Sequence, residues 1–263
     1  MATAIDRVRV HESRLKLGLF ALFGVVFLAL LGPGLADPLT FWTGIVLGDY
    51  LYPGHQVHHF VLATVVALLL LGVIAQAPRP SHRAPALHTS VIVLLALVVS
   101  NLLGGEPAVG LLLFVALLLG MVLTHPAGRE QLPTVAELHR PHAIVAGVTA
   151  IVAIGMAAIE ILAHLSAADE HVTFGHYVMM ATAWLSIGAL GLLGSLRGRG
   201  WRFPTYGAVS LLLVFGVASV VFPGPEQGSS LGVTFGVIAV VWAIAIVLVA
   251  ERGHEMAAHL SRE

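Results

Sequence analysis

The sequence contains no cysteine, a single lysine (Lys16) and few charged residues of either sign. Without cysteine the chain cannot form disulfides, thiolate metal sites, iron–sulfur clusters or cysteine-based nucleophiles. Charged residues make up 10% of its 263 residues, whereas soluble domains carry about 25%. No basic patch is interleaved with aromatic residues, which argues against a nucleic-acid partner. So few charged groups cannot cover a water-facing surface, and the lipid bilayer must therefore surround much of the chain.

Long apolar runs fill most of the sequence, and hydrophobic residues make up 58% of it. A helix needs about 17–25 such residues to cross the hydrocarbon core of a bilayer. The runs predict eight transmembrane helices, at 17–36, 57–77, 88–104, 107–124, 143–163, 174–195, 204–222 and 230–250. Only helices satisfy their own backbone groups in lipid without closing a barrel. The expected fold class is therefore an all-α integral membrane protein.

The basic residues fall on one side of this eight-span path. All thirteen lie in the N-terminal tail, in the loops that follow the second, fourth and sixth spans, and in the C-terminal tail. By the positive-inside rule this predicts a multi-pass protein of the cell membrane with both termini in the cytoplasm. The opposite loops carry acidic residues instead: Asp37, Asp49, Glu106, Asp169, Glu170 and Glu226. The basic tail and first apolar run also fit a cleavable signal peptide, which would leave seven spans.

Two weaker patterns add to the architecture. The stretch 38–52 is too short to span, and its aromatic residues predict a segment lying at the outer membrane interface: Phe41, Trp42, Tyr50 and Tyr52. Sliding the chain by 117 residues places His59 on His176 and aligns the apolar runs that follow them. This match predicts two four-helix halves, 1–137 and 138–263, related as parallel repeats.

Histidine is over-represented, with 14 copies in a chain that has few other polar residues. The predicted topology sorts the histidines into an outer and an inner layer, with none at mid-bilayer. Neutral imidazole binds haem iron, copper and zinc, although a single histidine at a helix end can also serve only to bond headgroups or cap carbonyls. The outer ligand candidates are His55, His59, His164 and His176, and the inner candidates are His88, His125 and His142. Glu160 is the candidate catalytic carboxylate, because a charge inside the membrane is costly.

These layers leave more than one function open. Two imidazoles facing each other across a bundle would hold a b-type haem, in respiratory electron transfer or in oxidase cofactor assembly. The alternative is a transporter, permease or metal-ion handling protein that uses the outer His/Glu cluster, with copper or zinc as the ion. The stretch HQVHH (55–59) also matches the HxxHH form of membrane di-iron enzymes. However, HRPH (139–142) is expected on the opposite side of the membrane and cannot share a metal pair with it.

Two longer motifs carry a family resemblance. GHQVHHFVLATVVALLLLGVIAQAPR (54–79) and FGHYVMMATAWLSIGALGLLGSLRGR (174–199) each join a histidine, an apolar span and a basic inner end. With eight spans in two halves, this arrangement resembles haem A synthase and its relatives. The resemblance implies haem ligation by His59 and His176 and an association with respiratory-chain subunits. The chain departs from the family at Gln56, where the family has a glutamate, and in lacking both the outer-loop cysteine pair and the partner histidines in 107–115 and 230–240.

Overall fold

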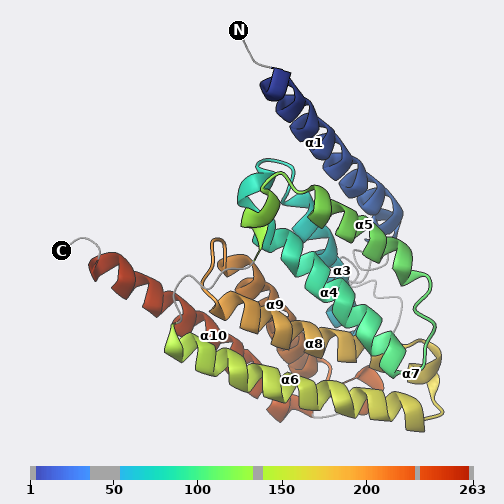
Figure 1. The fold of residues 1–263 in the computed structure, drawn as a ribbon. Helices are drawn as coiled ribbons and strands as arrows, with labels where there is room; N and C mark the ends of the chain where they lie inside the picture. Colours follow the sequence, from blue (N-terminus) through green and yellow to red (C-terminus); the bar gives the residue numbers. More distant parts are fainter. Residues whose placement is uncertain (1–3, 36–53, 133–138, 229–231, 261–263) are drawn as a thin grey trace.

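The computed structural model describes residues 4–35, 54–132, 139–228 and 232–260, and all regular secondary structure in these ranges is helical. The long helices are α1 (Ala4–Leu31), α3 (Gln56–Ile74), α4 (Ala84–Leu103), α5 (Leu111–Thr124), α6 (Arg140–Ser166), α8 (His176–Ser195), α9 (Arg202–Val221) and α10 (Gly232–Leu260) (Figure 1). Single turns join them: η1 (Gly32–Leu35), η2 (Pro80–His82), η3 (Gly128–Gln131), α7 (Glu170–Thr173) and η4 (Pro225–Gln227). Within these ranges seven helices are long and apolar enough to cross a membrane. The predicted all-α membrane class is confirmed.

The eighth helix, α5, is shorter than the span predicted at 107–124. It has 14 residues, which corresponds to about 21 Å of rise. The residues before it do not extend it: Gly105 has φ +79°, and the N–H of Leu111 donates to the carbonyl of Ala108 in a turn rather than in an α-helix. The apolar run was therefore read correctly as a helix, but its first turn was placed too early.

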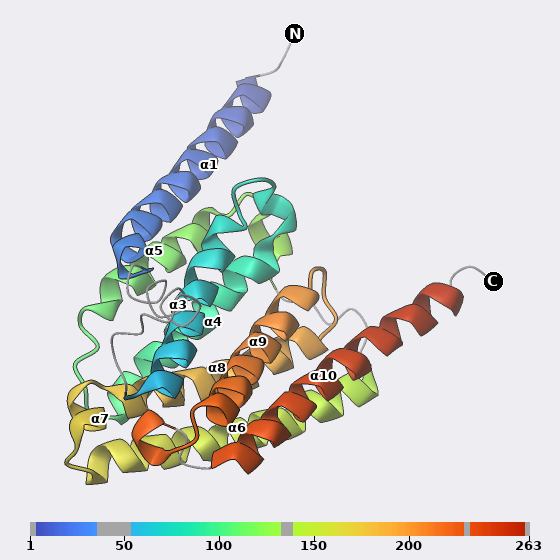
Figure 2. The ribbon, with the colours of Figure 1, turned by 180° about the vertical axis from the view of Figure 1, so that it is seen from behind.

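Four helices form the centre of the bundle. Helix α3 packs against α4 and α9, and α8 packs against α4, α9 and α6. Helix α10 covers α9, whereas α1 packs mainly on α5 at the side of the bundle (Figures 1 and 2). The two predicted halves thus meet through α3 and α4 on one side and α8 and α9 on the other. Their relation as repeats stays a prediction.

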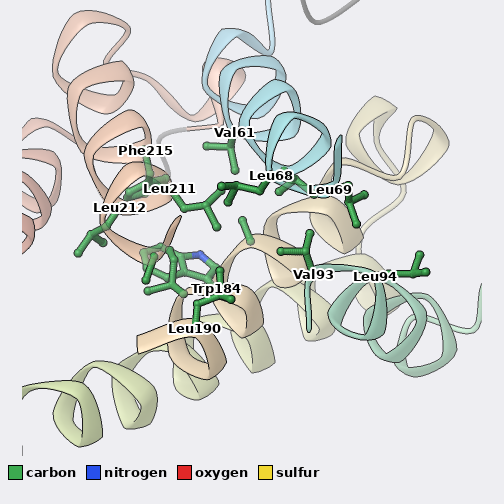
Figure 3. Close-up of a cluster of buried hydrophobic side chains, with 14 of the residues drawn as sticks. Val61, Leu68, Leu69, Val93, Leu94, Trp184, Leu190, Leu211, Leu212 and Phe215 are labelled. Carbon is green, nitrogen blue, oxygen red and sulfur yellow. The ribbon is translucent and has the colours of Figure 1, made fainter. Parts of the chain in front are cut away.

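The sequence of the central helices explains why they lie inside. Helices α3 and α8 are apolar around their whole circumference, which is typical of buried helices, and they bury more of their length than α1 or α10. Trp184 of α8 packs edge-on against Phe215 of α9, with ring centroids 4.9 Å apart, in a core shared by all four central helices (Figure 3). Small residues permit close approach, as where Gly72 of α3 faces Ser90 of α4.

The two ends of the bundle differ in charge. The basic end carries Arg79, Arg83, Arg140, Arg197, Arg199 and Arg202. Arg199–His82 joins two of its loops, and Arg202–Glu251 joins α9 to α10. The acidic end carries Glu106, Asp169, Glu170 and Glu226, with no lysine or arginine in the part of the chain that is described. The N-terminal end of α1 and the C-terminal end of α10 both point away from α7, which lies at the acidic end (Figures 1 and 2). Both therefore lie on the basic side. The interfacial segment predicted at 38–52, and Asp37 and Asp49 with it, fall outside the described residues.

Candidate metal centre

Four histidines meet at the acidic end. His55 and His58 come from the start of α3, whereas His171 and His176 come from α7 and the start of α8. One potential ligand atom from each lies within 4.8 Å of all the others. The ring of His55 is 4.5 Å from that of His171 and 4.7 Å from that of His176, between centroids. The ring of His58 is 4.8 Å from that of His176.

Local backbone turns bring the four rings together. His55 is the N-cap of α3 and has φ +63°, a left-handed conformation that is uncommon for a residue other than glycine. Gly175 has nearly the same conformation at the N-cap of α8, with φ +66°, so that the chain turns sharply between α7 and His176. The turn α7 is capped by Asp169, whose Oδ1 accepts a hydrogen bond from the backbone of Val172 at 3.2 Å.

Each of the four rings has one buried nitrogen that finds no hydrogen-bond partner among the residues that the structure describes. These atoms are Nδ1 of His55, Nδ1 of His58, Nε2 of His171 and Nδ1 of His176. A buried polar atom without a partner is costly, and four such atoms in one place call for a shared ligand. Imidazole nitrogen is a good ligand for zinc, copper and other first-row transition ions.

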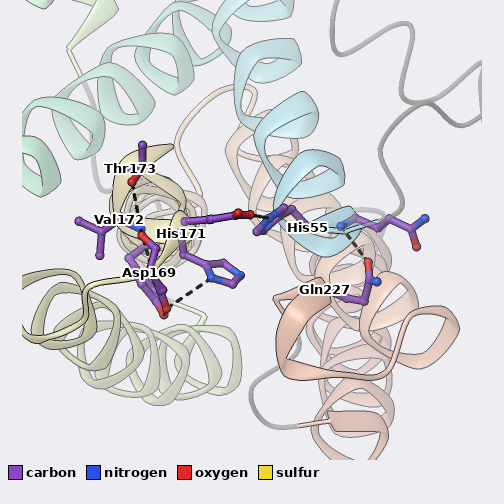
Figure 4. Close-up of polar contacts among 9 residues, drawn as sticks. His55, Asp169, His171, Val172, Thr173 and Gln227 are labelled. Atoms are coloured by element: carbon purple, nitrogen blue, oxygen red, sulfur yellow. Dashed lines mark hydrogen bonds and ion pairs between the residues drawn. The ribbon is translucent and has the colours of Figure 1, made fainter.

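Two of the rings are oriented by carboxylates on their other nitrogen. Nε2 of His55 lies 3.7 Å from Oε2 of Glu170, and Nδ1 of His171 lies 3.6 Å from Oδ2 of Asp169 (Figure 4). In each ring the nitrogen without a partner is therefore the one turned away from the carboxylate. Histidines that bind metals usually have such a carboxylate, which fixes the ring and raises its basicity.

The loop between α9 and α10 supports the site from behind. The backbone N–H of His55 donates to the carbonyl of Glu226 at 3.0 Å, and that of Gln56 donates to Oε1 of Gln227 at 3.2 Å (Figure 4). Gly228 lies against His58 so closely that a Cβ atom there would be 2.5 Å from Nε2 of the ring. The turn η4 thus fixes the start of α3 and limits the position of His58.

The surroundings of His171 favour its neutral form. Burial is the largest effect on the pKa of His171 and lowers it, and the neighbouring His55 lowers this pKa further. The nearby Asp169 and Glu170 act in the opposite direction without reversing the shift. A neutral imidazole has a free lone pair, which is the form that binds a metal.

The structure brings together two of the four predicted outer ligands, His55 and His176. His59 lies beside them, with its ring 5.4 Å from that of His176, but it is not one of the four. His164 is buried and its Nε2 contacts Oε1 of Glu106 at 3.2 Å instead. Glu160, the candidate catalytic residue, is buried on α6 one turn before His164.

The sequence analysis did not select His58 or His171 as ligands. Both belong to the predicted outer layer, and His58 is part of HQVHH. The signal that was missed is the short spacing from His171 to His176 across a glycine, which allows a tight turn between the two histidines.

The inner histidines lie at the basic end and are spread over several contacts. His125 faces Gln76, at 3.4 Å between Nε2 and Oε1, and burial lowers its pKa to about 4, with His88 nearby adding to the shift. His142 is fully buried against the ring of Trp201. Among the described residues, no group of three or more potential metal ligands gathers at this end.

Comparison with family models, with curated proteins and with solved structures found no match to this chain. The resemblance to haem A synthase therefore stays a prediction, as do haem ligation and an association with respiratory-chain subunits.

Proposed function

We propose that this protein is a multi-pass membrane protein that captures a transition-metal ion, of the Zn²⁺ or Cu²⁺ class, at its acidic end. The observation that carries the proposal is the meeting of four histidines, with one potential ligand nitrogen from each within 4.8 Å of the others. Each of these rings also has a buried nitrogen without a hydrogen-bond partner among the described residues. Under the positive-inside rule the acidic end faces away from the cytoplasm, so the ion would come from outside.

The donor set supports this class of ion. Four neutral nitrogen ligands suit zinc, copper, nickel and cobalt, whereas calcium and magnesium prefer oxygen ligands. Zinc–nitrogen bonds of about 2.0–2.1 Å in a tetrahedral site put the nitrogens about 3.3 Å apart. The observed spacing of up to 4.8 Å closes to this value by small rotations of the rings.

The compactness of the cluster favours a single ion over a haem at this position. A bis-histidine haem has its porphyrin plane between two imidazoles. Here the four rings share one small volume, so a porphyrin between any two of them would displace the others.

Capture and retention fit the protein better than conduction through the bundle. Below the metal centre, most hydroxyls of the central helices are occupied with each other or with backbone carbonyls, as in Ser100–Thr182 and Ser186 to the carbonyl of Thr182. The hydroxyl of Ser219 on α9 has no partner among the described residues. The rest of the shared core is apolar. Between the acidic end and the basic end, an ion would therefore meet no further imidazole or carboxylate on α3, α4, α8 or α9.

The charge of the acidic end supports the arrival of cations. Asp169 and Glu170 lie beside the four histidines, and Glu106 and Glu226 lie in neighbouring loops. A surface of one sign raises the local concentration of the oppositely charged ligand and its rate of association.

The experiment is to measure metal content by mass spectrometry after loading the purified protein with Zn²⁺ or Cu²⁺ and removing the excess. We expect one bound ion per chain in the wild type. His58→Ala and His176→Ala should each lose most of the bound metal. His82→Ala, at the basic end, is the matched control and should keep the ion. An absorption spectrum of the same sample tests for haem.

The proposal is overturned if the wild type retains no more metal than His58→Ala. A Soret band that His176→Ala removes would likewise overturn it, and would support the haem hypothesis instead.

A further inference from the structure

A second site lies at the opposite end of the molecule. A cavity of about 80 Å³ opens at the basic end, between the turn η2, the start of α4 and the loop that joins α8 to α9. A single water needs about 10–15 Å³ of such a volume, so the cavity holds about five to eight water-sized groups. That is the size of a small polar headgroup.

The lining carries both signs of charge. Arg199 and His82 lie on one side, where the guanidinium donates a hydrogen bond to Nδ1 of the imidazole, and Ser81 adds a hydroxyl. Because Nδ1 accepts, the ring of His82 has its proton on Nε2. Arg199 keeps further N–H donors besides the one given to His82. This combination of donors suits a phosphate group.

Glu130 lines the same cavity and makes no ion pair within the described part of the chain. Arg199 pairs with His82 rather than with this carboxylate. A cavity that holds opposite charges apart suits a ligand that is itself dipolar, with an anionic group for Arg199 and a cationic group for Glu130.

His88 adds a second imidazole to the lining, and most of the remaining wall is apolar. Leu193 and Leu196 lie at the end of α8 and Leu132 follows η3. The cavity therefore sits where helices end and loops begin, at the level of lipid headgroups, with leucines leading toward the hydrocarbon. Basic pockets between transmembrane helices at this depth commonly bind lipid headgroups.

We propose that this cavity binds a phosphate ester that also carries a primary amine, and that its source is a membrane lipid with a phosphoethanolamine headgroup. The phosphate lies at Arg199 and His82, and the ammonium lies at Glu130. The site is separate from the metal centre and does not depend on it.

The test is native mass spectrometry of the full chain, delipidated in detergent and titrated with three lipids of equal chain length. Their headgroups are phosphoethanolamine, phosphocholine and phosphoglycerol. The wild type should retain the phosphoethanolamine lipid preferentially. Arg199→Gln should weaken its binding about fivefold, whereas Arg199→Lys, which keeps the charge, should retain most of it.

Glu130→Gln separates the two charges of the ligand. It should remove the preference for phosphoethanolamine over phosphoglycerol while leaving binding of both lipids. Arg79→Gln changes an exposed basic residue near the same loop that does not line the cavity, and it should bind as the wild type does.

Soluble phosphoethanolamine and inorganic phosphate distinguish the sources. If neither soluble compound displaces the lipid at equal concentration, the result supports a membrane lipid as the ligand. Displacement of the lipid by soluble phosphoethanolamine overturns the membrane source. Equal retention of all three lipids by the wild type, or wild-type binding by Arg199→Gln, overturns the site. Metal content is measured on the same samples and should not change, so failure here is distinguishable from failure of the proposed metal function.

Discussion

His55 and His171 come from different halves of the chain, yet their rings lie 4.5 Å apart, edge to face. Each ring has a carboxylate near one nitrogen, Glu170 for His55 and Asp169 for His171, and on the other nitrogen no hydrogen-bond partner from the described part of the chain. The pair shows how the candidate centre is built. The carboxylates determine which nitrogen faces inward, and the packing of α3 against α8 brings the inward nitrogens together.

Removing the charge of Asp169 should weaken metal binding without abolishing it. Asp169→Asn keeps an oxygen that can cap α7, but it loses the charge 3.6 Å from Nδ1 of His171. We expect an affinity about 10–100-fold lower, as is usual for the carboxylate partner of a ligating histidine. A competition titration with a chelator measures this affinity.

Glu226→Gln is the matched control. Glu226 is an exposed acidic residue of the same end that contributes only its backbone to the site, so this variant should leave the metal affinity unchanged. Equal affinities in the two variants would contradict the role given to Asp169.

Adding one methyl group at Gly228 should displace His58. In Gly228→Ala the new Cβ atom would be 2.5 Å from Nε2 of the ring. The imidazole can swing aside, so the main loss should be in metal affinity, beyond a strain cost of about 1–2 kcal/mol at φ +89°.

Gly232→Ala is the matched control for Gly228→Ala. Gly232 has φ +64°, and a Cβ atom there meets nothing within 4 Å. It should lower thermal stability by a similar amount and keep the metal. Loss of metal in both variants would indicate a general effect of strain rather than displacement of His58.

Acidification should release the metal. The fold lowers the pKa of His171 through burial and the neighbouring His55, so it favours the neutral ring. The contribution of His171 to stability is therefore fully present above the unfolded-state pKa of about 6.5. It is lost as the pH falls toward the lower pKa of the folded state. Protons also compete directly with the metal for all four nitrogens. Metal retained after dialysis should therefore decrease steadily from about pH 7.5 to about pH 5. Retention that is constant or increases over this range would contradict the four-imidazole centre.

The orientation of the bundle can be tested with single cysteines, because the natural sequence contains none. Glu226→Cys lies at the acidic end and Arg79→Cys at the basic end, and both positions are exposed. By the positive-inside rule, a membrane-impermeant maleimide should label the first in intact cells and the second only after permeabilisation. The reverse pattern would place the metal centre on the cytoplasmic side.

Much of the fold was predictable because the bilayer imposes strong rules on sequence. Uninterrupted apolar runs predicted all the long helices, and proline and glycine marked their ends. The start of α5 was missed, since the run from Pro107 to Gly110 is apolar enough to join a span but does not form a helix.

The candidate site was predictable only in part. Position along the helices was enough to find the outer layer of histidines and to select His55 and His176. It could not show that His164 is engaged by Glu106, because that contact joins α6 to the loop after α4. It also could not select His171, which enters the cluster only through the turn α7 and the left-handed Gly175.

The division of the four ligands between α3 and the α7–α8 corner has a consequence for how the protein is made. Membrane helices enter the bilayer in the order of their synthesis, and a chain that has inserted only α3 presents two of the four imidazoles. The complete centre exists only once α8 is in place beside α3. Under the proposed function, metal loading would therefore be a late step of biogenesis, and a chain arrested before α8 would be inserted in the membrane without the complete centre.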